Sequence, residues 1–137
     1  MAKSPELERL ALQWLERASH DLLTAEHTLK LGDGCPFDTV CFHAQQCAEK
    51  SMKALLVYYG IQFPRSHDLT ELQPLFPKGK WPESVTIHEL AELGPYAVEA
   101  RYPGEWEMPD LIEASHAVEL AKKIFGAMKT TLTTAKA

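Results

Sequence analysis

Basic and imidazole side chains gather near one polar turn of this sequence and reappear further along the chain. They are Lys50, Lys53, Arg65, His67 and Arg101. Cations that converge can bind a phosphate or another anion, because charge-assisted hydrogen bonds to ionised groups are strong. Taken singly, Arg65 and Arg101 also fit a structural role, in which each neutralises helix C-terminal carbonyls or a nearby acid. Both interpretations stay open from the residues alone.

The polar turn itself reads Ser66-His67-Asp68, which contains the residue types of a serine triad. Three adjacent residues cannot line up as nucleophile, base and orienting acid, because neighbouring side chains point in different directions. We expect Asp68 to cap the helix that follows, and Asp21 to pair between helices. The sequence contains no G-x-S-x-G motif, which would mark a serine nucleophile. It also contains no G-x-x-x-x-G-K-[ST] motif, so it has no phosphate-cradling glycine loop.

Metal chemistry has little support. His43 and Cys47 stand four residues apart on one predicted helix and could reach the same ion. A structural zinc site needs four ligands, and no second pair supplies the rest. We therefore expect no metal and no cofactor. The three cysteines, Cys35, Cys41 and Cys47, are an odd number without paired spacing, which predicts reduced thiols.

Helical periodicity runs through nearly the whole chain. Apolar residues recur at spacings of three and four, and no alternating strand pattern occurs. Pro95 falls inside the fourth helical pattern and predicts a kink or break near residues 93–94. The sequence predicts an all-α antiparallel bundle of about five helices, with a four-helix-bundle core plus a short helix. The expected helices cover about 5–31, 37–59, 68–76, 83–100 and 110–132, in a single domain of residues 1–137.

Several segments match the pattern of a known family. Residues 48–60 read AEKSMKALLVYYG, residues 67–69 read HDL, and residues 100–103 read ARYP. Residues 18–25 fit the pattern A-x-x-D-L-x-x-A. Together they resemble the HEPN family, small helical domains named for higher-eukaryote and prokaryote nucleotide binding. The resemblance spans about residues 7–132 and implies the same all-α fold.

The resemblance also carries an expectation about function. Small stand-alone HEPN domains are typically partners of a separately encoded minimal nucleotidyltransferase and help to bind nucleotide or substrate. The resemblance implies a non-catalytic binding or interaction module of this kind, as in a toxin–antitoxin or nucleotidyl-transfer pair. It makes the set Lys50, Lys53, Arg65, His67 and Arg101 the best candidate for an anion or nucleotide pocket.

Nuclease-like HEPN proteins carry an R-x(4–6)-H pattern that acts on an RNA phosphodiester. No arginine here has a histidine at that spacing. His67 follows Arg65 after one residue, and the first histidine after Arg101 is His116. We therefore expect no activity from the chain alone. The alternative is an RNA-cleaving toxin with a rearranged site, in which histidine transfers protons and arginine stabilises charge on the phosphate, drawn from Arg65, His67, Arg101 and His116.

Net charge and hydropathy bear on nucleic-acid binding and on the location of the protein. The net charge is −5, which argues against a grip on nucleic acid spread over the whole surface. No apolar run of transmembrane length occurs, and the charged N-terminus is not followed by an apolar stretch. These features predict a cytoplasmic protein.

Apolar residues outside the main helical stripes predict self-association. They are Leu10, Leu15, Phe42, Val57, Trp81 and Trp106. A bundle of this size can cover only part of them, and large uncovered apolar patches usually mark interfaces. A two-fold axis is the commonest way to bury such a patch. The sequence therefore predicts a homodimer, as does the HEPN resemblance.

Overall fold

The chain folds into helices joined by irregular segments, and the described residues contain no strand. The structure is a computed structural model that describes residues 4–98, 104 and 107–137. The predicted all-α fold is confirmed. Within these residues there are five α-helices and two short 3-10 helices: α1 (Pro5–Leu29), α2 (Phe37–Tyr58), α3 (Leu69–Leu72), η1 (Gln73–Leu75), α4 (Ile87–Glu92), η2 (Gly94–Tyr96) and α5 (Leu111–Lys136).

Helix ends follow local signals in the sequence. Ser4, Asp68 and Asp110 each accept a hydrogen bond from a backbone amide in the first turn of α1, α3 and α5. A short polar side chain at this position satisfies an amide that has no partner inside the helix. Gly60 follows α2 with a φ of 71°, a left-handed conformation that glycine adopts without steric cost. The predicted cap at Asp68 is therefore confirmed.

The fourth helix is shorter than predicted. It was expected to start near residue 83, but α4 starts at Ile87 behind a reciprocal capping box between Thr86 and Glu89. Its early end agrees with the predicted break, because η2 replaces the α-helix at Gly94 and Pro95. The third helix is shorter as well, since η1 follows it at Gln73.

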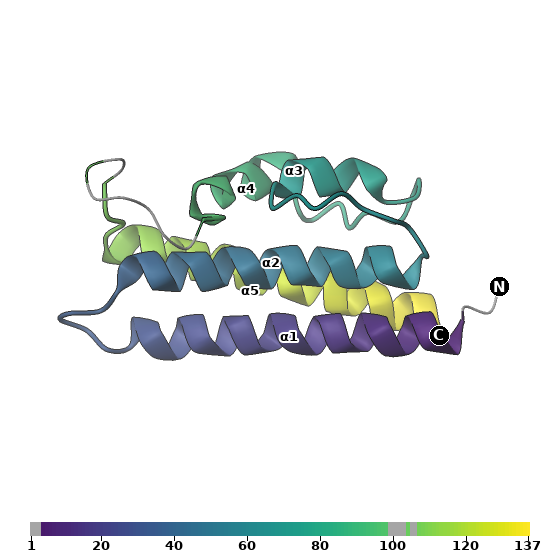
Figure 1. The fold of residues 1–137 in the computed structure, drawn as a ribbon, viewed down its shortest axis with the longest axis horizontal. Helices are drawn as coiled ribbons and strands as arrows, with labels where there is room; N and C mark the ends of the chain where they lie inside the picture. The colour runs from purple at the N-terminus through teal and green to yellow at the C-terminus, as the bar shows by residue number, and fades with distance from the viewer. Residues whose placement is uncertain (1–3, 99–103, 105–106) are drawn as a thin grey trace.

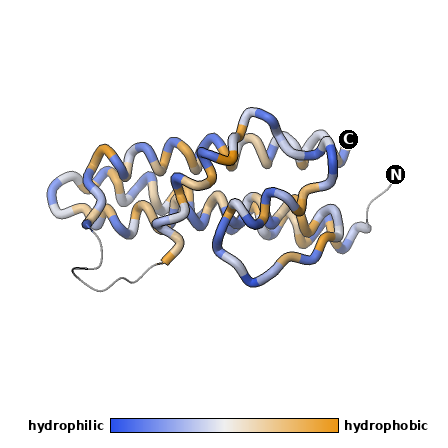
Figure 2. Tube along the Cα trace, turned by 90° about the horizontal axis from the view of Figure 1, so that it is seen from above, coloured by the Kyte–Doolittle hydropathy of each residue, from blue (hydrophilic) through white to orange (hydrophobic). Residues whose placement is uncertain are grey.

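Three long helices form the body of the molecule (Figure 1). α1 runs antiparallel to α2, and α5 runs back along both of them in the direction of α2. The short helices α3 and α4 form a layer on the side of α2 that faces away from α1 (Figure 1). α2 is therefore the central element, and apolar residues (orange in Figure 2) recur along all of the long helices.

Small residues let the long helices approach closely. Ala11, Ala18 and Ala25 are spaced by seven along α1 and are completely buried. A seven-residue spacing keeps side chains on one helix face, and the distance between packed helices depends on the size of the side chains at the contact. Larger side chains such as Met52 and Leu55 of α2 fill the rest of the core.

The apolar residues that motivated the homodimer are in part covered by the fold. Leu15, Val57 and Trp81 are half-buried against the core, and Trp106 lies outside the described residues. Partial cover of this set was expected, and the first three are among the side chains that the bundle covers in part. Exposed apolar side chains occur elsewhere, and the most exposed is Ile112 at 79%. Self-association stays a prediction. None of the helices within the described residues has the length and apolar character needed to cross a membrane.

Candidate ligand-binding site

A buried polar stripe runs along α2. Gln45, Glu49 and Lys53 are spaced by four, so they lie on one face of the helix, and none is more than 7% exposed. The Lys53 ammonium donates to Glu49 Oε2 at 3.0 Å. Gln45 Nε2 donates to Glu49 Oε1 at 3.2 Å. Each buried charge thus has a partner, as burial requires.

The stripe anchors the segment between α2 and α3. His67 Nδ1 lies 3.0 Å from Glu49 Oε1, and Gln45 Nε2 donates to the His67 carbonyl oxygen at 2.9 Å. The Lys53 ammonium also lies 5.2 Å from the centre of the Phe63 ring, within range of a cation–π interaction. These contacts cover Glu49 and Lys53 and fix where the polar turn lies on the bundle.

The polar turn forms one wall of an open hollow of about 620 Å³, which we call the Arg65–His67 hollow. Arg65, Ser66, His67, Asp68 and Thr70 line one side, and Ala91, Gly94 and Ala97 line the other. Arg65 is exposed and forms no ion pair with the described residues. Asp68 is engaged, because its carboxylate caps α3 and accepts from the Thr70 hydroxyl at 2.6 Å. The hollow therefore contains one arginine that forms no ion pair with the described residues, and one carboxylate whose hydrogen bonds are made to α3.

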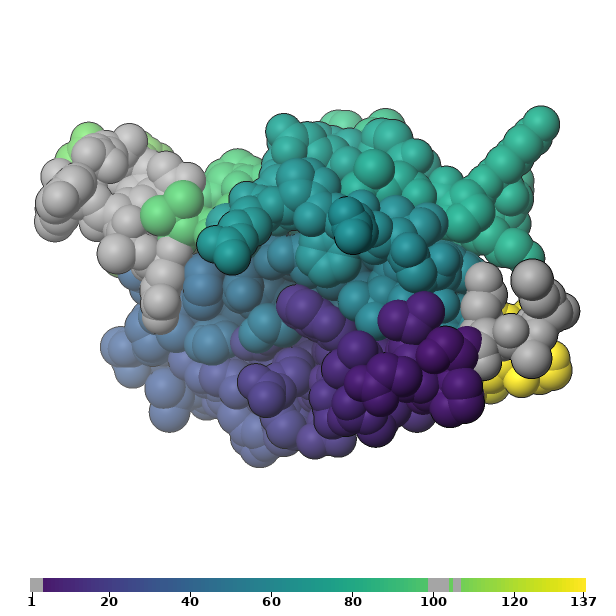
Figure 3. All heavy atoms as spheres, turned by 45° about the vertical axis from the view of Figure 1, so that its right-hand side comes forward, coloured from purple at the N-terminus to yellow at the C-terminus, as the bar shows by residue number. Residues whose placement is uncertain are grey.

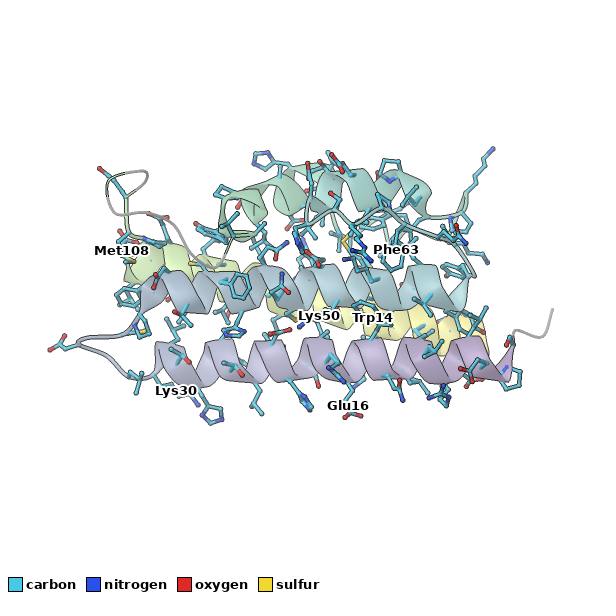
Figure 4. All side chains as sticks on the ribbon, in the orientation of Figure 1. Trp14, Glu16, Lys30, Lys50, Phe63 and Met108 are labelled. Atoms are coloured by element: carbon cyan, nitrogen blue, oxygen red, sulfur yellow. The ribbon has the colours of Figure 1, made fainter. Side chains whose placement is uncertain are left out.

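A second hollow lies at the seam between α1 and α2, and we call it the α1–α2 hollow. It has a volume of about 350 Å³ and is lined by Leu10, Gln13, Trp14, Arg17 and Lys50. Figure 3 shows the surface on which α1 (purple) meets α2 and the following segment (blue to teal). In Figure 4, Trp14 and Lys50 lie side by side at this seam, and Phe63 lies above them.

Asp21 connects the two helices beside this seam. It is 8% exposed, and its two carboxylate oxygens have different partners on α2. His43 Nδ1 lies 2.8 Å from Oδ1, and the Lys50 ammonium donates to Oδ2 at 2.7 Å. The predicted pairing of Asp21 between helices is therefore confirmed.

Comparison with known proteins identifies the family. The model of the HEPN domain matches residues 11–131, nearly the whole chain. The chain belongs to the HEPN family. A crystal structure of TT1696 from Thermus thermophilus is similar to it, with a TM-score of 0.74 and 30% identity over 88% of this chain and 97% of the other.

A second solved structure shares the HEPN fold. ST0689, described as an archaeal HEPN homologue, has a TM-score of 0.65 and 23% identity over 89% of this chain and 97% of that one. No curated protein matches the chain. The resemblance read from residues 18–25 and 48–69 thus led to the right family.

The candidate ligand residues of this HEPN domain do not gather in one place. Arg65 and His67 share the Arg65–His67 hollow, whereas Lys50 lines the α1–α2 hollow. Lys53 is buried in its ion pair with Glu49. Arg101 lies outside the described residues. The four candidates that the structure describes therefore do not form a single pocket.

His116, named for the alternative nuclease site, lies in a third hollow with Glu92, Tyr96 and Glu113. Its Nε2 contacts the Glu92 carboxylate. This hollow and the Arg65–His67 hollow have no lining residue in common, so the structure does not bring His116 together with Arg65 and His67.

Sequence reasoning missed part of the α1–α2 hollow. Gln13, Trp14 and Arg17 were not among the candidate ligand residues named from the sequence. The spacing of Leu10, Trp14 and Arg17 by four and three places them on one face, and this was the available signal. Nothing in the sequence alone showed that Lys50 of α2 would stand opposite them.

The cysteines of this HEPN chain are buried, free thiols. Burial raises the pKa of the Cys41 and Cys47 thiols to about 12, because desolvation disfavours the thiolate. They are therefore protonated at neutral pH and unsuited to nucleophilic attack or metal binding. No group of three metal-ligating side chains occurs within the described residues.

Proposed function

We propose that this HEPN chain is a non-catalytic binding module that holds a nucleotide in the Arg65–His67 hollow. The observation that carries the proposal is an exposed arginine without an ion-pair partner among the described residues, beside the hydroxyls of Ser66 and Thr70. An arginine fork matches the geometry of a phosphate group, and hydroxyls add hydrogen bonds. The volume of about 620 Å³ falls within the roughly 300–1,000 Å³ of ordinary ligand pockets.

In this proposal the chain works with a separately encoded minimal nucleotidyltransferase, and the HEPN chain itself is a homodimer. Exposed apolar side chains near the start of α5 support an interface with another chain, because Met108, Leu111 and Ile112 are 60%, 55% and 79% exposed. Met108 lies at the end of the bundle where α5 begins (Figure 4). No further residues are needed for catalysis, since the partner supplies them.

Co-purification tests the partnership. We expect the neighbouring reading frame to encode a small protein with a G-S-x(about 9)-D-x-D pattern, and the two chains to elute together after tagging either one. Substitution of Leu111 and Ile112 by serine serves as the comparison variant and is expected to weaken the elution of the partner or of the dimer. A neighbour without the pattern, together with a tagged chain that elutes alone, would contradict the partnership.

One contact favours a second function, cleavage of RNA. His67 Nδ1 lies 3.0 Å from the buried Glu49 carboxylate, and Arg65 lines the same hollow. A carboxylate that orients an imidazole is the arrangement found in many general bases, and an arginine can stabilise charge on a phosphate. His67 and Arg65 could therefore act together in the cleavage of a phosphodiester, even without the R-x(4–6)-H spacing.

Incubation with RNA separates the two functions. Purified protein and its His67→Ala variant are incubated with a labelled single-stranded RNA over a range of pH. We expect no cleavage above the level of the variant, because His67 is the one histidine among the described residues that line the hollow, and His116 lies elsewhere. Cleavage that is lost in His67→Ala would favour the ribonuclease and overturn the non-catalytic assignment.

A further inference from the structure

The α1–α2 hollow combines an aromatic wall with two cations, and the proposed function does not use it. Its lining has an apolar part, Leu10 and Trp14, and a polar part, Gln13, Arg17 and Lys50. Its volume of about 350 Å³ is at the small end of the roughly 300–1,000 Å³ of ligand pockets. The hollow therefore suits a small ligand with one flat apolar part and one charged part.

The Trp14 ring is held in place by a neighbouring ring and a buried cation. The Phe63 ring meets it edge to face, with centroids 6.3 Å apart and planes at 79°. The Lys53 ammonium, itself fixed by Glu49, lies 5.9 Å from the Trp14 centroid. A ring fixed by such neighbours loses little conformational freedom when a second ring packs on it. Trp14 is thus a rigid platform for a planar group.

The charge of the hollow favours an anion. Lys50 is neutralised by Asp21 at 2.7 Å, but Arg17 forms no ion pair with the described residues, so one positive charge is left over. Arg17 follows Gln13 by four residues and Trp14 by three, which places its guanidinium on the same face of α1. Glu16 points away from the seam in Figure 4 and does not compensate it.

We propose that the α1–α2 hollow binds a small planar aromatic anion. The ring packs against Trp14 and Leu10, and a phosphate or carboxylate group accepts hydrogen bonds from Arg17 and Lys50. A nucleoside monophosphate and an aromatic carboxylate share this chemistry. The site is independent of the Arg65–His67 hollow, with which it has no lining residue in common.

Nuclear magnetic resonance of the indole N–H groups tests the site in the full chain. The Trp14 signal is assigned with a Trp14→Phe variant, and the protein is titrated with AMP and, separately, with naphthalene-2-carboxylate. Adenosine, which lacks the anion, and ribose 5-phosphate, which lacks the ring, are the matched probes. We expect at least one of the two aromatic anions to shift the Trp14 signal, and both matched probes to bind at least fivefold more weakly than that anion.

Three variants complete the test. Arg17→Ala is expected to weaken binding about fivefold, Arg17→Lys to restore part of the loss, and Arg65→Ala to leave the Trp14 titration unchanged. A response to AMP alone identifies a nucleotide site, and a response to the carboxylate alone identifies a site for aromatic acids. The proposal is overturned if neither anion moves the Trp14 signal, if ribose 5-phosphate binds as tightly as AMP in a nucleotide response, or if Arg17→Ala binds like the wild type.

Discussion

Replacing Lys53 by methionine is expected to lower the free energy of unfolding by about 3 kcal/mol, since breaking a buried ion pair typically costs about 3–5 kcal/mol. Lys53 and Glu49 are 7% and 3% exposed, so the substitution leaves a carboxylate buried without its cation. Methionine keeps most of the volume against Trp14 and Phe63, which isolates the loss of charge. We expect a loss at the lower end of this range because Gln45 and His67 still contact Glu49.

Urea denaturation followed by circular dichroism measures this change. Lys123→Met is the matched control, because it removes the ion pair of Lys123 with Glu89, in which the lysine side chain is 45% exposed. An exposed pair contributes at most about 1 kcal/mol. The double variant Lys53→Met with Glu49→Gln is expected to recover part of the lost stability. If Lys53→Met costs no more than Lys123→Met, the buried stripe does not stabilise the bundle as described.

Helix positions were predictable because their signals are local. The residue types of Ser4, Asp68 and Asp110 indicate helix starts, and Gly60 indicates a helix end. These signals do not depend on distant parts of the chain. Thr86 and Glu89 carry a capping box of the same kind, yet the apolar periodicity that continues back to Val85 obscured it. The start of α4 was misplaced for that reason.

The site was harder to predict because burial there depends on segments far apart in the sequence. Lys50 and Lys53 were assigned from the sequence to one candidate pocket. The segment that carries Phe63 and His67 folds back over Glu49 and Lys53, whereas Lys50 stays at the edge of the seam with α1. These residues of one helix thus have two different surroundings. The spacing of apolar residues shows which face of a helix is buried, but it does not show which distant segment covers that face.

The resemblance to the HEPN family predicted how the helices pack, which periodicity alone does not. It predicted the fold better than it predicted the site. Residues 18–25 contain packing positions, and three of them, Ala18, Leu22 and Ala25, are buried in the core together with Asp21. Packing positions constrain which helices meet and where. They say little about Arg65 or Arg17, which are exposed and take no part in that packing.

The largest functional effect is expected from Arg65. Removal of its guanidinium takes away the one cation of the Arg65–His67 hollow that no described residue neutralises. A charge-assisted contact with phosphate contributes about 1.5–3 kcal/mol, and each 1.4 kcal/mol corresponds to about tenfold in affinity. We therefore expect Arg65→Ala to bind a nucleoside triphosphate at least about tenfold more weakly than the wild type.

Isothermal titration of the purified chain with ATP and with GTP is the most direct test of a nucleotide-binding function. Arg9→Ala is the matched control, because Arg9 is an exposed arginine on α1 that already pairs with Glu6 and lines neither hollow. We predict binding by the wild type, unchanged binding by Arg9→Ala, and the loss of about tenfold or more in Arg65→Ala. Failure of the wild type to bind either nucleotide, or equal affinity in Arg65→Ala, would contradict this prediction.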